Sequence, residues 1–113
     1  MDIDLAKGML LEYWRVEKLC ESLLDALPPH QFKQQAAQLR YSARQTSRLI
    51  APLELEVVDY IHQRYVPNLP VQVINNEEMV GEGELTIVQT IEPTIVRQGE
   101  VLHLGRVIVK GRS

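Results

Sequence analysis

The spacing of apolar residues changes at Ala51-Pro52, and this change limits the fold more than any other feature of the chain. Before it, apolar residues recur every third or fourth position, as in amphipathic helices. After it, they alternate with polar residues, as in half-buried strands. Helices followed by strands predict an α+β fold. We therefore expect a helical hairpin in residues 1–51 and a small, mainly antiparallel β domain in residues 52–113.

The helical region is predicted to be an antiparallel hairpin. Helix one should run from about Asp4 to Ala26 and end at "LPPHQ", since two prolines do not fit a helix interior. Pro29 suits the first turn of a second helix, whose apolar row is weaker and made largely of small residues. Helix one carries a row with heptad spacing, widened by Leu5, Leu10, Leu19 and Leu24. Because this apolar surface is too wide for a lone hairpin to bury, we expect a homodimer built on Met9, Tyr13, Val16, Cys20, Leu23, Leu27, Leu39 and Ala43.

Charged residues also follow lines along the two predicted helices. Acidic residues recur in helix one at Glu17, Glu21 and Asp25, and basic residues recur in helix two at Arg40, Arg44 and Arg48. The interpretation we favour is two solvated faces with weak ion pairs, since exposed pairs contribute only about 0–1 kcal/mol each. The alternative is that the arginine line binds an acidic partner.

The β region is predicted to hold about five strands. Alternation predicts a strand over Leu53–Tyr60, followed by a proline-containing loop and an extended run over Val71–Ile74. An acidic turn follows, and the residues of "ELTIVQTIE" are the most strand-like in the chain, so the sheet is expected to be centred there.

The final segment is predicted to be a hairpin with a two-residue turn at Gln98-Gly99. This turn pairs Arg97 with Glu100, Val96 with Val101 and Ile95 with Leu102, and it requires a positive φ at Gly99. Gly105 is expected to form a bulge in the last strand.

Composition favours binding over catalysis. The 113 residues carry 12 basic and 15 acidic side chains, a net charge of −3, which gives no general attraction for nucleic acid or anionic membranes. One cysteine and three scattered histidines offer no metal-ligand spacing, and no phosphate-binding loop or nucleophile motif is present. A hydrolase using Cys20 or the pair Asp59 and His62 is disfavoured. We expect no enzymatic activity, no cofactor and no metal, in a cytoplasmic protein that binds neither nucleic acid nor membrane.

Two segments of the β region resemble the GrpE family, the nucleotide exchange factors of DnaK-type chaperones. "YVPNLPVQV", Tyr65–Val73, resembles the family's FDPNLHEAV-type segment. "EPTIVRQGEVLHLGRVIV", Glu92–Val109, resembles its C-terminal signature of a turn followed by a Val-rich strand. An acidic linker at Glu77–Glu84 and two helices before the β domain also match the family's order. The resemblance covers roughly Pro52–Lys110, and the helices only in kind.

The resemblance implies a binding function in which this protein catalyses no reaction of its own. The β domain would bind the ATPase domain of a DnaK-type chaperone and promote ADP release, through the partner-binding residues Pro67, Asn68, Leu69, Arg97, Gly99, His103 and Arg106. The sequence departs from the family where Val66, Pro70 and Val71 replace Asp, His and Glu, and it has no room for the family's long N-terminal helix. A dimeric adaptor that binds a protein without exchange activity is therefore the alternative.

Overall fold

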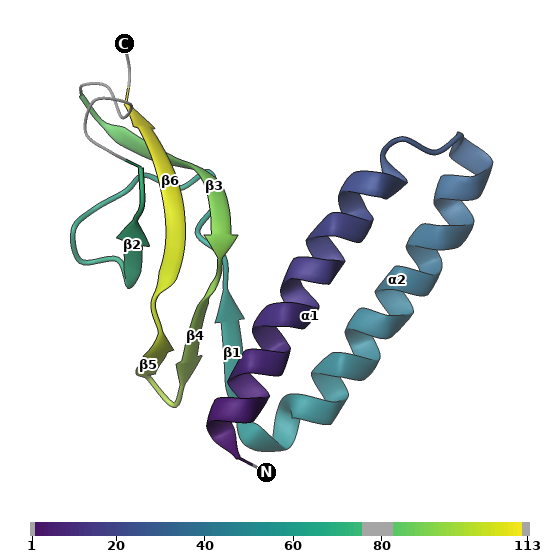
Figure 1. The fold of residues 1–113 in the computed structure, drawn as a ribbon, viewed down its shortest axis with the longest axis horizontal. Coiled ribbons are helices and arrows are strands. Elements are labelled where there is room, and N and C mark those ends of the chain that lie inside the picture. The colour runs from purple at the N-terminus through teal and green to yellow at the C-terminus, as the bar shows by residue number, and fades with distance from the viewer. Residues whose placement is uncertain (1, 76–82, 112–113) are drawn as a thin grey trace. The chain divides into compact units, whose positions relative to one another are not determined.

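The fold is described from a computed structural model, which describes residues 2–75 and 83–111. The chain divides into two compact units, Met1–Glu54 and Leu55–Ser113. The first holds two helices and a short 3₁₀ turn, and the second holds six strands among the described residues (Figure 1). The predicted α+β fold is confirmed.

The helical unit is an antiparallel hairpin of α1 (Ile3–Leu24) and α2 (Pro29–Ile50). Asp2 caps α1, because its carboxylate accepts a 2.9 Å hydrogen bond from the Asp4 N–H. Pro29 occupies the first turn of α2, where no intrahelical donor is needed. The bounds agree closely with those expected from the prolines and the apolar spacing.

The predicted start of the first strand is wrong. Residues Ala51–Leu53 form the 3₁₀ turn η1, closed by a 3.0 Å hydrogen bond from the Glu54 N–H to the Ala51 carbonyl. Glu54 then adopts a left-handed conformation with a φ of 58°. Strand β1 therefore begins at Leu55 and ends at Val58, because the backbone leaves the extended region before it.

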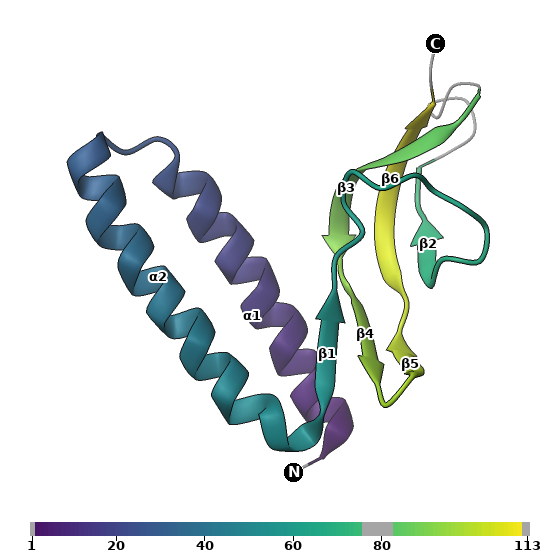
Figure 2. The same ribbon diagram turned by 180° about the vertical axis from the view of Figure 1, so that it is seen from behind.

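The β unit contains two three-stranded sheets that share one long, bent hairpin. The hairpin's arms are β3 (Leu85–Glu92) continued by β4 (Thr94–Arg97), and β5 (Glu100–His103) continued by β6 (Gly105–Gly111). The order is β1-β4-β5 in one sheet and β2-β6-β3 in the other, with β2 spanning Val71–Val73. Figure 2 shows both arms bending between β3 and β4 and between β5 and β6.

Strand β6, rather than β3, is the centre of its sheet, so the predicted centre is wrong. It pairs in parallel with β2 and antiparallel with β3. The outer edge of β3 is occupied by the preceding loop, since the His62 and Tyr65 N–H groups donate to the Ile87 and Leu85 carbonyls, both at 2.8 Å. The sheet therefore extends on both sides of β6.

The tight turn of the final hairpin is confirmed, but its register is partly wrong. Gln98 and Gly99 have φ values of 50° and 81°, and Arg97 pairs with Glu100 as expected. Val96 also pairs with Val101. Ile95, however, lies opposite His103 instead of Leu102, because the register shifts at this point. The expected bulge at Gly105 is wrong as well, since this residue opens β6 in the other sheet.

The core of the β unit lies against β3 and β6. Ile87, Val107 and Val109 are 0–1% exposed, and the half-buried side chains packed around them are Tyr60, Tyr65, Leu69, Val71, Val73 and Leu85. Most of the predicted acidic linker, Glu77–Glu84, lies outside the described residues.

Candidate functional site

The two segments that carry the family resemblance meet in one sheet. Strand β2, at the end of the Tyr65–Val73 segment, pairs with β6, near the end of the Glu92–Val109 segment. Val71 lies opposite Gly105 and Gln72 opposite Arg106. Residues more than thirty positions apart in sequence are thereby neighbours in the sheet, and of these pairs Gln72 and Arg106 are both exposed.

The proline loop before β2 is a rigid double turn. The Leu69 N–H donates to the Val66 carbonyl at 3.1 Å, which places Pro67 and Asn68 at the exposed tip. The Val71 N–H then donates to the Leu69 carbonyl at 2.8 Å, forming a second, tighter turn around Pro70. Leu69 itself packs against the core of the unit, so the side chains that the loop presents to solvent are those of Pro67 and Asn68.

His103 lies where the long hairpin bends. Its Nε2 is 3.2 Å from Oε1 of Glu92, and the two side chains are only 24% and 17% exposed. Glu92 also lies opposite Arg106 in the pairing of β3 with β6. His103 therefore joins the end of β5 to the end of β3, whereas Arg106 is exposed.

Of the seven predicted partner-binding residues, Leu69 packs against the core and His103 lies against Glu92, and the other five lie in two places. Pro67 and Asn68 are exposed at the tip of the loop before β2, and Arg106 is exposed on β6, the strand with which β2 pairs. Arg97 and Gly99 lie at the tip of the β4 and β5 hairpin, where Arg97 is half-buried. The loop and the start of β6 form the more compact candidate surface.

In the helical unit, the predicted dimerisation residues of α1 and of the turn after it differ in exposure. Tyr13, Cys20 and Leu27 are half-buried, whereas Met9, Val16 and Leu23 are 53–62% exposed. The exposed residues of α1 include two that the predicted set of dimerisation residues left out, Leu5 at 58% and Leu19 at 59%. Their heptad spacing from Met9 and Val16 is the signal that could have placed them there.

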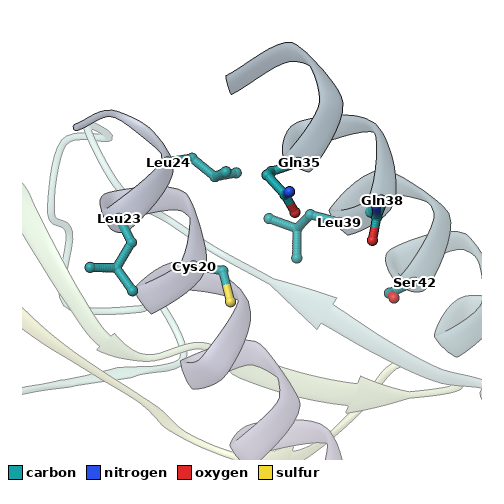
Figure 3. A pocket seen from close by; sticks show the side chains of 7 residues that line it. All are labelled: Cys20, Leu23, Leu24, Gln35, Gln38, Leu39 and Ser42. Atoms are coloured by element: carbon teal, nitrogen blue, oxygen red, sulfur yellow. The ribbon is translucent and has the colours of Figure 1, made fainter. Parts of the chain in front are cut away.

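Two open pockets are lined by residues of both helices. One of about 300 Å³ is lined by Cys20, Leu23, Leu24, Gln35, Gln38, Leu39 and Ser42. Figure 3 shows Leu24 of α1 and Leu39 of α2 pointing towards each other across it. A second, of about 360 Å³, is lined by the first turns of α1 and the end of α2. Tyr13 lines this pocket, and its hydroxyl is buried without a hydrogen-bond partner among the described residues. The hairpin is therefore loosely packed, and Ala43 is half-buried within it.

Glu17 lies on α1 in a partly buried position. Burial raises the pKa of its carboxyl above the ordinary value, and the neighbouring charge of Glu21 raises it further, while Lys18 acts in the opposite direction. An acid whose charged form is disfavoured here destabilises the unit when it ionises.

The possible catalytic pair has structural roles. Asp59 Oδ1 accepts a 3.0 Å hydrogen bond from the Ile61 N–H and a 2.6 Å hydrogen bond from the Thr90 hydroxyl, so it holds the end of β1 near β3. His62 is exposed and has a φ of 70°. Across residues 2–75 and 83–111, no group of three or more His, Cys, Asp or Glu side chains is arranged to hold a metal ion. Within the same ranges, neither helix is both long and apolar enough to cross a membrane.

Comparison of the chain with protein-family models, with curated proteins and with solved structures finds no match in any of the three.

Proposed function

We propose that the chain is a GrpE-like nucleotide exchange factor that binds the ATPase domain of a DnaK-type chaperone through its β unit and dimerises through its helical unit. The observation that carries the proposal is the pairing of β2 with β6, which joins the two segments that resemble the family in one sheet. Two segments that bind a common partner are expected to lie close together in the fold. Binding residues are often found on loops that a well-packed scaffold holds in place, as the sheet holds this loop.

The proposed mechanism is a linkage between two binding events. The loop tip, Pro67 and Asn68, and the exposed Arg106 contact the chaperone, and Arg97 at the tip of the β4 and β5 hairpin extends the contact. Binding favours a chaperone conformation in which ADP has fewer contacts. By thermodynamic reciprocity, ADP and this protein weaken each other's binding by the same factor.

The proposed dimer uses the exposed face of α1. Leu5, Met9, Val16, Leu19 and Leu23 form one row, each more than half exposed. Fully burying such a side chain is worth about 1.5–3 kcal/mol, and these residues start more than half exposed, so the row offers several kcal/mol to an association. Glu12, which interrupts the row, lies 3.7 Å from Arg15 of the same helix, so its charge has a local partner.

Exchange is tested by following the release of a fluorescent ADP analogue from a DnaK-type chaperone of the same organism in a stopped-flow instrument. The wild type is expected to accelerate release, and Arg106→Ala is expected to reduce the acceleration. Lys110→Ala is the matched control, because Lys110 is an exposed cation on the same strand but lies further from the loop. Equal losses in both variants would contradict a specific contact at Arg106.

The alternative function is a dimeric adaptor that binds a protein partner without promoting exchange. The observation that favours it is the replacement of three family positions by Val66, Pro70 and Val71 in the loop and β2. The same experiment separates the two functions, since complex formation without faster release would leave only the adaptor.

Dimerisation is tested by measuring the mass in solution, for which one chain contributes 12.9 kDa. The wild type is expected at twice this mass at micromolar concentration, and Leu19→Lys is expected to shift the population towards the monomer. Ser22→Lys adds the same charge to an exposed position outside the apolar row and should leave the mass unchanged. A wild-type mass of one chain would overturn the proposed dimer.

A further inference from the structure

The side chain of Thr94 lies at the point where the long hairpin bends. It is 1% exposed. Among the residues that the structure describes, Thr94 is the one polar residue that is buried as a whole. It follows the buried Pro93 and opens β4. A buried hydroxyl is costly unless it is hydrogen-bonded, so its partners indicate what it does.

The Thr94 hydroxyl bridges two other segments of the chain. Oγ1 donates a 2.9 Å hydrogen bond to the carbonyl of Pro70 and accepts a 3.2 Å hydrogen bond from the Gly105 N–H. A hydroxyl carries one proton and two lone pairs, so it makes both bonds at once. The loop, the start of β4 and the start of β6 are thereby joined at one atom.

Gly105 makes this arrangement possible. A Cβ at this position would lie 2.7 Å from Oγ1 of Thr94 and 3.1 Å from the backbone carbonyl of Glu92. The first distance is shorter than side chains tolerate, so any larger residue would displace the hydroxyl. Thr94 and Gly105 therefore fit each other as a pair.

Pro70 is the residue through which the hydroxyl reaches the candidate binding loop. The two residues that follow the Pro67 and Asn68 tip are both anchored: Leu69 packs against the core, and the Pro70 carbonyl accepts a hydrogen bond from the Thr94 hydroxyl. The Gly105 N–H also donates a 3.2 Å hydrogen bond to the Pro70 carbonyl, so this carbonyl accepts from both the Thr94 hydroxyl and the Gly105 amide.

We propose that Thr94 is the positioning residue of the binding surface: its hydroxyl holds the Val66–Pro70 loop in a fixed place at the point where β2 begins to pair with β6. This inference rests on the proposed function and adds the residue that sets the geometry of the site. A loop that is ordered before binding loses less conformational entropy on binding, so its partner is bound more tightly. Thr94 acts through Pro70 and touches no partner itself.

The positioning is tested by amide hydrogen exchange on the full-length protein. Thr94→Val keeps the shape of the side chain and removes the hydroxyl, whereas Thr94→Ser keeps the hydroxyl. In Thr94→Val the amides of Leu69, Val71 and Gly105 are expected to exchange about tenfold faster or more, while the amide of Ile87 in the core keeps its rate. Thr94→Ser is expected to restore slow exchange in the loop.

Two results of the exchange experiment would overturn the proposal. Unchanged loop exchange in Thr94→Val would show that the hydroxyl does not hold the loop, and an equal acceleration at Ile87 would show a role in global folding only. Should Thr94→Val fail to fold, Gly105→Ala replaces it, because the added Cβ is expected to displace the same hydroxyl and to accelerate the same loop amides.

The contribution to binding is tested with the isolated ATPase domain of a DnaK-type chaperone as the probe. Thr94→Val is expected to weaken binding about tenfold, mainly through faster dissociation, and Thr94→Ser to bind like the wild type. Equal affinity of Thr94→Val and the wild type would overturn the role in binding. If the wild type itself does not bind, the proposed function fails, and the exchange experiment still decides whether Thr94 positions the loop.

Discussion

The two units of the chain differ in how completely each buries its own apolar residues. In the β unit, Ile87 and Ile95 are fully buried and Val107 and Val109 are 1% exposed. In the helical unit the buried residues are Ala6, Leu10 and Ala36, two of which are small, and the large apolar side chains that remain exposed include Leu5, Met9, Val16, Leu19, Leu23, Phe32, Tyr41 and Leu49. The β unit therefore buries large side chains completely, although it exposes some apolar residues such as Leu104, whereas the helical unit leaves many of its large apolar side chains exposed.

The difference follows from the geometry of the two kinds of element. A strand alternates its side chains between two faces, so three adjacent strands bring one face together into a continuous core. An α-helix spreads its side chains around a cylinder, and one neighbouring helix covers only part of a wide apolar stripe. The cavity lined by Leu24 and Leu39 shows how incompletely α2 covers α1.

The strongest test of this comparison is a large-to-small substitution in each unit. Ile87→Ala should destabilise the β unit by about 2–5 kcal/mol, because it removes a fully buried side chain and leaves a cavity. Leu49→Ala, at a position on α2 that is 78% exposed and outside the proposed dimer row, should cost less than about 0.5 kcal/mol. Amide exchange measured in β6 for the first and Trp14 fluorescence for the second report the two units separately. A similar loss in both would contradict the difference in packing.

The turn of the final hairpin offers a second test within the β unit. Gly99→Val should cost about 1–2 kcal/mol, since φ at this position is 81° and a β-branched residue is strained there. No heavy atom lies within 4 Å of a Cβ at Gly99, so crowding adds nothing. Gly99→Asn, which tolerates the left-handed region, is the control and should be affected less. Helical circular dichroism should persist in both variants, and its loss would mean that the turn stabilises more than its own unit.

Dilution sharpens the comparison without a substitution. If the helical unit is completed by a second copy, its stability should fall by about 1.4 kcal/mol per mole of dimer for each tenfold dilution. Urea unfolding followed by Trp14 fluorescence, which reports α1, measures this shift. Amide protection at Ile87 should stay constant over the same range. A midpoint for α1 that does not depend on concentration would contradict a self-association of this unit.

The smallest expected effect concerns pH. The pKa of Glu17 is raised in the folded protein, so the folded state holds this proton more tightly than the unfolded chain does. The helical unit should therefore lose some stability as the pH rises from the ordinary range of a glutamate through the raised pKa. Glu17→Gln should remove this dependence and slightly raise the thermal midpoint at neutral pH. Glu21→Gln is a control with a smaller effect, because the charge of Glu21 is the secondary cause of the raised pKa. If neither variant changed the pH dependence of stability, burial of Glu17 would not affect the stability of the unit.

The elements that depend on local chemistry could be predicted from the sequence. Pro29 marks the start of α2, and Gln98-Gly99 forms the expected tight turn with Arg97 opposite Glu100. These features depend on residues that are neighbours in the chain. The strand start expected at Leu53 is wrong. The alternation of apolar and polar residues begins at Leu53, but the backbone forms a 3₁₀ turn there and becomes extended only after Glu54.

The candidate site was only partly predictable. The loop tip at Pro67 and Asn68 was expected, because proline and asparagine favour turns and exposure. The residues that hold the loop in place were not predicted, because the sequence around Thr94 indicates only an ordinary strand residue. Nothing local indicates that its hydroxyl meets the Pro70 carbonyl, a residue 24 positions away.

The sequence was enough to predict the two kinds of structure, the start of α2 and the Gln98-Gly99 turn, because periodicity, proline and glycine act over a few residues. The tertiary structure alone decided that β6 is central, that Ile95 faces His103, and that Gly105 admits the Thr94 hydroxyl. It also decided which apolar residues of α1 are buried and which are exposed. These outcomes depend on packing between residues distant in the chain, where several registers satisfy the same pattern and steric fit selects one of them.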